Sequence, residues 1–109
     1  MESNKTVILT VDQVADYLED WARDYADIDF EYSDFYCGIG RDMDERAEWH
    51  RTKVIKFVKT DSRDSAGKIE KEMCKRGFNT GRRPDNGGTE DSICVYIYPI
   101  TQNTRQVTD

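Results

Sequence analysis

The sequence predicts a single α+β domain in which three helices flank a small sheet, either mixed or antiparallel. Three patterns indicate this class: a long amphipathic helical pattern near the N-terminus, short β-rich segments that alternate with further helical segments, and a strictly alternating segment near the C-terminus. At 109 residues the chain can build one modest core. We expect residues 1–100 to form this domain and residues 101–109 to form a polar tail.

The N-terminal region predicts a strand followed by the first helix. Residues 5–10 (KTVILT) are rich in β-branched side chains, which favour a strand. Thr10 and Gln13 have the spacing of a capping box, so a helix begins after Thr10. The apolar residues that follow recur at helical spacing: Val11, Val14, Leu18, Trp21 and Tyr25. The opposite face is acidic, which indicates a solvated surface or, alternatively, a surface for a basic partner.

The middle of the chain predicts two strands and two helices. Residues 35–39 and residues 54–58 favour strands, and Asp42 with Glu45 marks the start of a short helix between them. A third helix begins at Asp61 or Ser62 and ends at Gly77. The core positions of this third helix are Ala66, Ile69 and Met73.

The C-terminal region predicts a long loop and a strand. Residues 77–91 are rich in glycine and polar residues, which favours a loop. Residues 92–100 (SICVYIYPI) alternate as a strand does. Ile93, Val95 and Ile97 are expected on one face of this strand, and Cys94, Tyr96 and Tyr98 on the other.

The composition disfavours several classes of function. A net charge of −6 disfavours a protein whose main task is to bind duplex nucleic acid, because such affinity depends on cations that neutralise phosphates. Three widely spaced cysteines and one histidine do not form a structural zinc motif, so reduced thiols are expected. With no apolar segment of membrane-spanning length and no signal-peptide pattern, we expect a soluble, cytoplasmic protein.

Four polar residues in the middle of the chain have the order of a phosphodiester-cleaving site: Tyr36, Arg46, His50 and Glu70. Arg46 and His50 are four apart and share one helix face. This order resembles the GIY-YIG nuclease superfamily. The resemblance implies that Glu70 holds a divalent ion such as Mg²⁺, that Arg46 neutralises the phosphate, and that Tyr36 or His50 handles the proton of the attacking water. Structural roles remain open, namely ion pairs for Arg46 and Glu70 and a helix C-terminal position for His50.

The first strand departs from that superfamily. A second tyrosine is expected from it, but the sequence there reads Val7-Ile8-Leu9. Tyr32 lies only four positions before Tyr36, too close to belong to a paired strand. The departure favours a scaffold that binds phosphates without cleaving them, with the Mg²⁺-dependent endonuclease acting on nucleic acid as the alternative.

The loop after the third helix has the residue types of a nucleotide pocket. An aromatic ring, amides and cations there match a base and its phosphates, and the Gly87-Gly88 pair allows backbone N–H groups to approach an anion. Alternatively, Phe78 packs back onto the third helix as a cap contact. The candidate ligand-binding residues are Phe78, Asn79, Arg82, Arg83, Asn86 and, from the tail, Arg105.

The size of the chain, this loop, the segment EDSICVYIYPI and the arginine in the tail are similar to a group of small phage anti-defence proteins. Those proteins sequester cyclic ADP-ribose isomers made by the bacterial Thoeris system, and some hold cyclic oligonucleotides. The similarity implies a non-enzymatic, homo-oligomeric sponge without a cofactor, acting in the cytoplasm of an infected or lysogenic bacterial cell. Phe78 would then stack on adenine while arginines clamp the pyrophosphate. A third possibility is an interaction module whose acidic first helix meets a basic partner.

Overall fold

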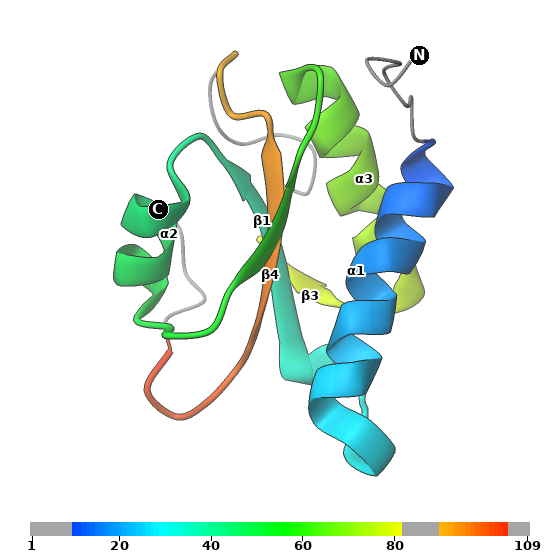
Figure 1. Ribbon diagram of the computed structural model, residues 1–109, viewed down its shortest axis with the longest axis vertical. Helices are drawn as coiled ribbons and strands as arrows, with labels where there is room; N and C mark the ends of the chain where they lie inside the picture. Colours follow the sequence, from blue (N-terminus) through cyan, green and yellow to red (C-terminus); the bar gives the residue numbers. More distant parts are fainter. Residues whose placement is uncertain (1–9, 82–89, 105–109) are drawn as a thin grey trace, which may run out of the picture.

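The computed structural model describes residues 10–81 and 90–104, and these ranges fold as an α+β domain with three α-helices and a four-stranded mixed sheet. The predicted fold class is therefore confirmed. The sheet stands between two helical layers: α1 and α3 cover one face and α2 lies on the other (Figure 1). In chain order the elements are α1 (Val11–Ala26), β1 (Phe35–Gly40), α2 (Met43–His50), β2 (Lys56–Lys59), α3 (Arg63–Arg76), β3 (Asn79–Thr80) and β4 (Cys94–Pro99).

The last strand of the described chain lies inside the sheet, whose order is β2-β4-β1-β3. β4 pairs antiparallel with both β1 and β2, and β3 pairs parallel with β1. Val95 and Ile97 belong to the core under α1 and α3, whereas Tyr96 and Tyr98 belong to a second cluster on the α2 side. The predicted alternation of this strand is confirmed.

Local capping signals position the helices. The Thr10 hydroxyl accepts a hydrogen bond from the Gln13 backbone at 3.1 Å, and the Gln13 side chain accepts one from the Thr10 backbone at 2.8 Å, which completes the predicted capping box. Asp42 accepts from the backbone N–H of Glu45 at the start of α2. Ser62, and not Asp61, is the N-cap of α3.

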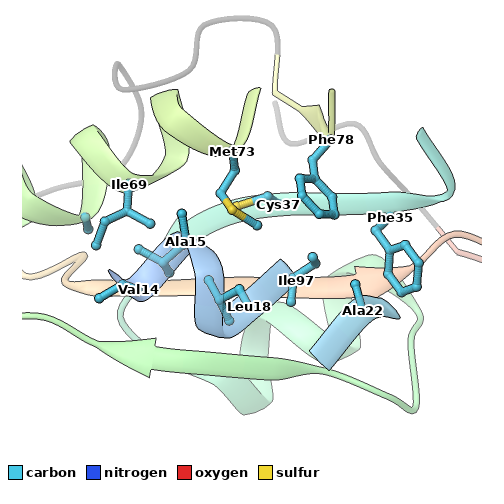
Figure 2. Close-up of a cluster of buried hydrophobic side chains, with 12 residues drawn as sticks. Val14, Ala15, Leu18, Ala22, Phe35, Cys37, Ile69, Met73, Phe78 and Ile97 are labelled. Carbon is cyan, nitrogen blue, oxygen red and sulfur yellow. The ribbon is translucent and has the colours of Figure 1, made fainter. Parts of the chain in front are cut away.

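The main core lies between the sheet and the α1–α3 layer (Figure 2). Val14 and Leu18 of the predicted α1 stripe supply one side of it, with Val11 and Trp21 packed against them, and Leu18, Ala15 and Ala22 have no exposed surface. Tyr25, the last residue of that stripe, is 52% exposed and lies outside the core. The predicted α3 positions Ala66, Ile69 and Met73 are also buried, as are Phe35, Cys37, Val95 and Ile97 from the strands. Truncating a side chain such as Leu18 to alanine would cost about 2–5 kcal/mol.

Three predicted segments differ from the structure or fall outside it. The segment predicted as a loop contains β3, in which Asn79 and Thr80 pair with Tyr36 and Cys37 of β1. The pair Asn79-Thr80 is too short and too polar to be recognised as a strand from the sequence. It forms a strand because the edge of β1 pairs with it. The strand over residues 54–58 begins later, at Lys56, because Thr52 and Val54 form a hydrogen-bonded turn.

The strand predicted over residues 5–10 lies outside the described residues except for Thr10, which caps α1. In the described part of the chain, none of the helices combines the length and the apolar character that crossing a membrane requires.

Candidate functional site

A cluster of aromatic side chains fills the space between the sheet and α2. β1 contributes Tyr36, and β4 contributes Tyr96 and Tyr98. His50, the last residue of α2, inserts among them, with its ring centroid 5.1 Å from that of Tyr36, 5.6 Å from that of Tyr96 and 4.9 Å from that of Tyr98. Alternation along the two strands places the three tyrosines on one face, and the C-terminal end of α2 brings the imidazole to them.

Both nitrogens of His50 have tyrosine partners. Nε2 lies 2.8 Å from the Tyr96 hydroxyl, and Nδ1 lies 2.8 Å from the Tyr98 hydroxyl. A neutral imidazole has one donor and one acceptor, so one hydroxyl donates to the ring and the other accepts from it. His50 has no exposed surface, so these two bonds offset the cost of burying its polar atoms.

Two glycines of β1 leave room for this arrangement. A Cβ atom at Gly38 would lie 2.6 Å from the Tyr96 hydroxyl oxygen, and one at Gly40 would lie 2.9 Å from Cγ of Arg46. The sequence Gly38-Ile39-Gly40 therefore clears the α2 side of β1 so that Tyr96 and Arg46 can lie against the backbone.

Arg46 is the cation of this site. Its stem lies over Gly40, and its guanidinium makes a side-chain hydrogen bond with Tyr96. The side chain is only partly buried, unlike the ring cluster beneath it. A guanidinium held in this way has donors left for a carboxylate or a phosphate, which it can bind in a bidentate manner.

The hydroxyls of Tyr96 and Tyr98 stay protonated at neutral pH. Burial raises the pKa of Tyr96 far above its ordinary value, and the nearby charge of Arg46 opposes this only in part. Burial likewise raises the pKa of Tyr98. The two side chains therefore act as neutral hydrogen-bonding groups and not as tyrosinate bases.

Tyr96 occupies a position that the sequence analysis missed. The first strand lacks the second tyrosine expected of a GIY-YIG-like site, but β4 lies antiparallel to β1 and places Tyr96 directly opposite Gly38. A second tyrosine thus joins Tyr36, Arg46 and His50 from the other end of the chain. The alternation of residues 92–100 already put Tyr96 and Tyr98 on one face. It could not predict that this face would lie under α2, beside Tyr36 of β1.

Glu70 lies on the other side of the sheet. It belongs to the buried part of α3, on the layer opposite α2 (Figure 1). There the pKa of Cys37, a core residue, is raised first by burial and then by the charge of Glu70. The structure brings Tyr36, Arg46 and His50 together but separates Glu70 from them, so the proposed four-residue catalytic set is not assembled. The described residues contain no group of three or more His, Cys, Asp or Glu side chains arranged to hold a metal ion.

The proposed loop pocket loses its aromatic residue. Phe78 is 3% exposed and packs in the main core (Figure 2). Its ring centroid lies 5.1 Å from that of Tyr32. Gly77, in the left-handed region at φ 116°, ends α3, and the backbone N–H of Phe78 donates to the carbonyl of Met73 at 3.1 Å. This is the cap contact considered as the alternative, and it excludes a stacking role for the ring.

The other loop residues give the pocket little support. The Asn79 side-chain amide donates to the backbone carbonyl of Ser33 at 2.6 Å, which ties β3 to the turn before β1. Arg82, Arg83, Asn86 and Arg105 lie outside the described residues. Only Phe78 and Asn79 of the predicted loop pocket belong to the described residues, and both make contacts that stabilise the fold.

Comparison with family models, with curated proteins and with solved structures gave no match to this chain. These comparisons assign no family to the chain. The polar side chains that converge in the described part of the structure lie on the α2 side of the sheet. There, one partly buried arginine is held by a buried network of histidine and tyrosines.

Proposed function

We propose that the protein binds a phosphate-bearing nucleotide without cleaving it, and that Arg46 is the residue that holds the phosphate. The observation that supports this is the position of the Arg46 side chain: Gly40 admits its stem, and its guanidinium interacts with the hydroxyl of Tyr96, which is itself bonded to His50. A cation whose geometry is set before the ligand arrives loses less side-chain entropy on binding. The fork of a guanidinium also matches the oxygens of a phosphate.

The ligand class remains the one that the sequence resemblance implies, a cyclic nucleotide signal such as an isomer of cyclic ADP-ribose. In this proposal the protein sequesters that signal as a phage anti-defence sponge in the bacterial cytoplasm, acting as a homo-oligomer and without a cofactor. In this proposal Arg46, and not the loop, binds the phosphate. Phe78 has no stacking role because its ring is buried in the core. The net charge of −6 favours a small ligand over a long duplex, because a single cationic site can neutralise few phosphates.

A Mg²⁺-dependent endonuclease is the second candidate, and one observation favours it. Tyr96 supplies the second tyrosine that the first strand lacks, so two tyrosines, an arginine and a histidine converge. Two observations weigh against it: Glu70 lies beyond the sheet, and His50, Tyr36 and Tyr96 are almost fully buried. A water that attacks a phosphodiester needs access to its base and to its metal.

Isothermal titration calorimetry with cyclic ADP-ribose and its isomers, in Mg²⁺ and then in EDTA, tests the proposal. Binding that persists in EDTA, with the ligand recovered intact, is the expected result. Arg46→Ala should weaken binding by about 2 kcal/mol, and Arg46→Lys should restore only part of it because an ammonium lacks the fork. Lys68→Ala is the matched control, since it removes an exposed cation of α3 on the far side of the sheet.

Two results would contradict the proposal. Equal affinities for the wild type and Arg46→Ala would remove Arg46 from the site. Mg²⁺-dependent nicking of DNA that is lost in Arg46→Ala and Tyr96→Phe would instead establish the endonuclease.

A further inference from the structure

β2 presents an exposed aromatic ring beside the proposed phosphate site. Phe57 is 46% exposed, although large apolar side chains of a small domain are usually buried. It pairs directly with Tyr96 of β4, so its side chain projects from the same face of the sheet as Tyr96, the α2 side. The neighbouring Val58 packs in the main core on the opposite face, as the strand alternation requires.

A second cation projects from this face two residues further along β2. Lys59 is exposed and pairs with Cys94, whose thiol pKa is raised by burial while the charge of Lys59 opposes that rise. Across β4 the same rung continues to Gly40, over which Arg46 lies. Lys59, Cys94 and Gly40 thus lie side by side across the three strands. Lys59 stands at the β2 end of this row, and Arg46 lies over Gly40 at the β1 end.

The spacing between these groups matches the size of a nucleotide. Phe57 and Gly38 lie on either side of Tyr96 in adjacent strands, and two strand spacings amount to about 10 Å. A base resting on Phe57 would thus place its phosphates near Arg46, which lies over β1, and Lys59 lies two residues along β2 from the ring. Sequence-tolerant binding of nucleotides commonly joins an aromatic platform to a cationic groove of this kind.

We propose that Phe57 is the base-stacking residue of the nucleotide site and that Lys59 assists Arg46 in holding the phosphates. This inference rests on the proposed function and deepens it, because it names the base-recognising element in place of Phe78. The ligand it fits is a nucleotide with a free base face and at least one phosphate, such as cyclic ADP-ribose. The surface formed by Phe57, Lys59 and Arg46 is called the Phe57 surface below.

The test compares two probes on the wild type and four variants, Phe57→Ala, Phe57→Trp, Tyr17→Ala and Arg46→Ala, by isothermal titration calorimetry. Cyclic ADP-ribose carries both a base and phosphates, and ribose 5-phosphate carries no base. Phe57→Ala should weaken the binding of cyclic ADP-ribose roughly tenfold or more, within the range measured for base–aromatic stacking. It should leave the binding of ribose 5-phosphate within about twofold of the wild type, since that probe has nothing to stack. Phe57→Trp should retain the affinity for cyclic ADP-ribose.

Tyr17→Ala is the matched control. Tyr17 is 48% exposed, close to the value for Phe57, but it belongs to α1 on the other side of the sheet, where Lys56 lies over its ring. Its removal should change neither affinity. Thermal melts of both variants show whether they are folded, and an exposed position such as Phe57 should tolerate the change.

The possible outcomes separate this inference from the proposed function. If Arg46→Ala weakens binding but Phe57→Ala does not, the role of Arg46 in phosphate binding is supported and the stacking role of Phe57 is refuted. If Phe57→Ala weakens both probes equally, the ring does not act by stacking and the inference is again wrong. If the wild-type protein binds neither cyclic ADP-ribose, its isomers nor ribose 5-phosphate, both proposals are overturned.

Discussion

Nε2 of His50 and the hydroxyl of Tyr96 lie 2.8 Å apart although 46 positions separate the two residues in the chain. His50 ends α2, and Tyr96 stands in the middle of β4, so this bond ties the α2 layer to the centre of the sheet. α2 has only eight residues and a weakly apolar sequence, MDERAEWH, and short helices owe most of their stability to tertiary contacts. The buried imidazole is therefore the anchor that holds Arg46 over the sheet.

Replacement of His50 by phenylalanine is predicted to destabilise the protein by about 2–4 kcal/mol. The ring volume is roughly kept, but two buried tyrosine hydroxyls lose their hydrogen bond to the imidazole, each at a cost of about 1–3 kcal/mol. Urea denaturation measures the change. The double variant His50→Phe/Tyr96→Phe should recover part of the loss, because one of the two hydroxyls that lost its bond to the imidazole is removed. Stability of the single variant within about 0.5 kcal/mol of the wild type would contradict the anchoring role of His50.

Alanine at Gly38 and alanine at Gly40 are predicted to have different effects. The new Cβ at Gly38 meets the rigid, buried ring of Tyr96 at 2.6 Å, so we expect a loss of stability of about 1–3 kcal/mol. At Gly40 it meets the flexible stem of Arg46 at 2.9 Å, which can move aside. Gly40→Ala should therefore cost less stability but should weaken the binding of a phosphate ligand. Thermal melts and calorimetry on both variants distinguish the effects, and equal melting temperatures would refute the difference.

Phe78→Ala is predicted to be a stability variant and not a binding variant. The side chain is 3% exposed among Phe30, Tyr32 and Phe35, and truncating a buried phenylalanine costs about 3–5 kcal/mol. Chemical denaturation should show this loss. Ligand affinity, measured at a temperature where the variant is folded, should equal that of the wild type. A large loss of affinity at full folding would return Phe78 to the ligand site.

Arg76 is predicted to clamp α1 to α3. Its guanidinium lies 2.8 Å from Asp16, 3.1 Å from Glu19 and 2.8 Å from Glu72, and its side chain is 18% exposed. Arg76→Ala leaves these carboxylates facing one another, so we expect a loss of about 1–3 kcal/mol. Lys68→Ala, which breaks the exposed pair with Asp64 at 3.3 Å, should cost less than about 0.5 kcal/mol. Denaturation curves at low and high salt compare the two, and a smaller effect at Arg76 than at Lys68 would refute the clamp.

Glu19 is predicted to make stability depend on pH in the acid range. Burial tends to raise the pKa of its carboxyl group, but hydrogen bonds from Arg23, Tyr32 and Arg76 outweigh burial and lower the pKa below its ordinary value of 4.5. A group whose pKa is lower in the folded state stabilises the fold above the unfolded pKa and loses that contribution as the pH falls through the folded pKa.

The variant Glu19→Gln tests this dependence. It should be less stable than the wild type at pH 7, and the difference should shrink as the pH falls below 4.5. Denaturation at a series of pH values measures it. A difference that stays constant between pH 7 and pH 3 would show that Glu19 acts through packing and not through its charge.

Most of the elements could be predicted because their signals are local. The capping box at Thr10, the helical spacing from Val14 to Leu18 and the alternation from Cys94 to Tyr98 each involve residues within a few positions of one another. β3 could not be predicted, since Asn79 and Thr80 form a strand only beside the edge of β1. The start of β2 was also misplaced, because the turn at Thr52 takes up the preceding residues.

The candidate site was predicted in part. Helical spacing put Arg46 and His50 on one side of α2, and in the structure both lie near the tyrosines of the sheet, with the His50 ring centroid 5.1 Å from that of Tyr36. The catalytic grouping that the resemblance implied stays a prediction. Glu70 was grouped with them because it follows at a suitable distance in the chain. Which face of the sheet a helix covers depends on the path of the whole chain, and that path puts α3 opposite α2.

The sequence by itself determined which residues can form helices, strands and caps, since those preferences come from the backbone and from neighbours in the chain. It also determined that the face with Tyr96 and Tyr98 differs from the face with Val95 and Ile97. Only the tertiary structure decided that β4 lies between β1 and β2, and hence that Tyr96 meets His50, Arg46 and Phe57. Long-range pairing is settled by the packing of all layers at once, so the residues that share the proposed ligand site come from segments that no local pattern connects.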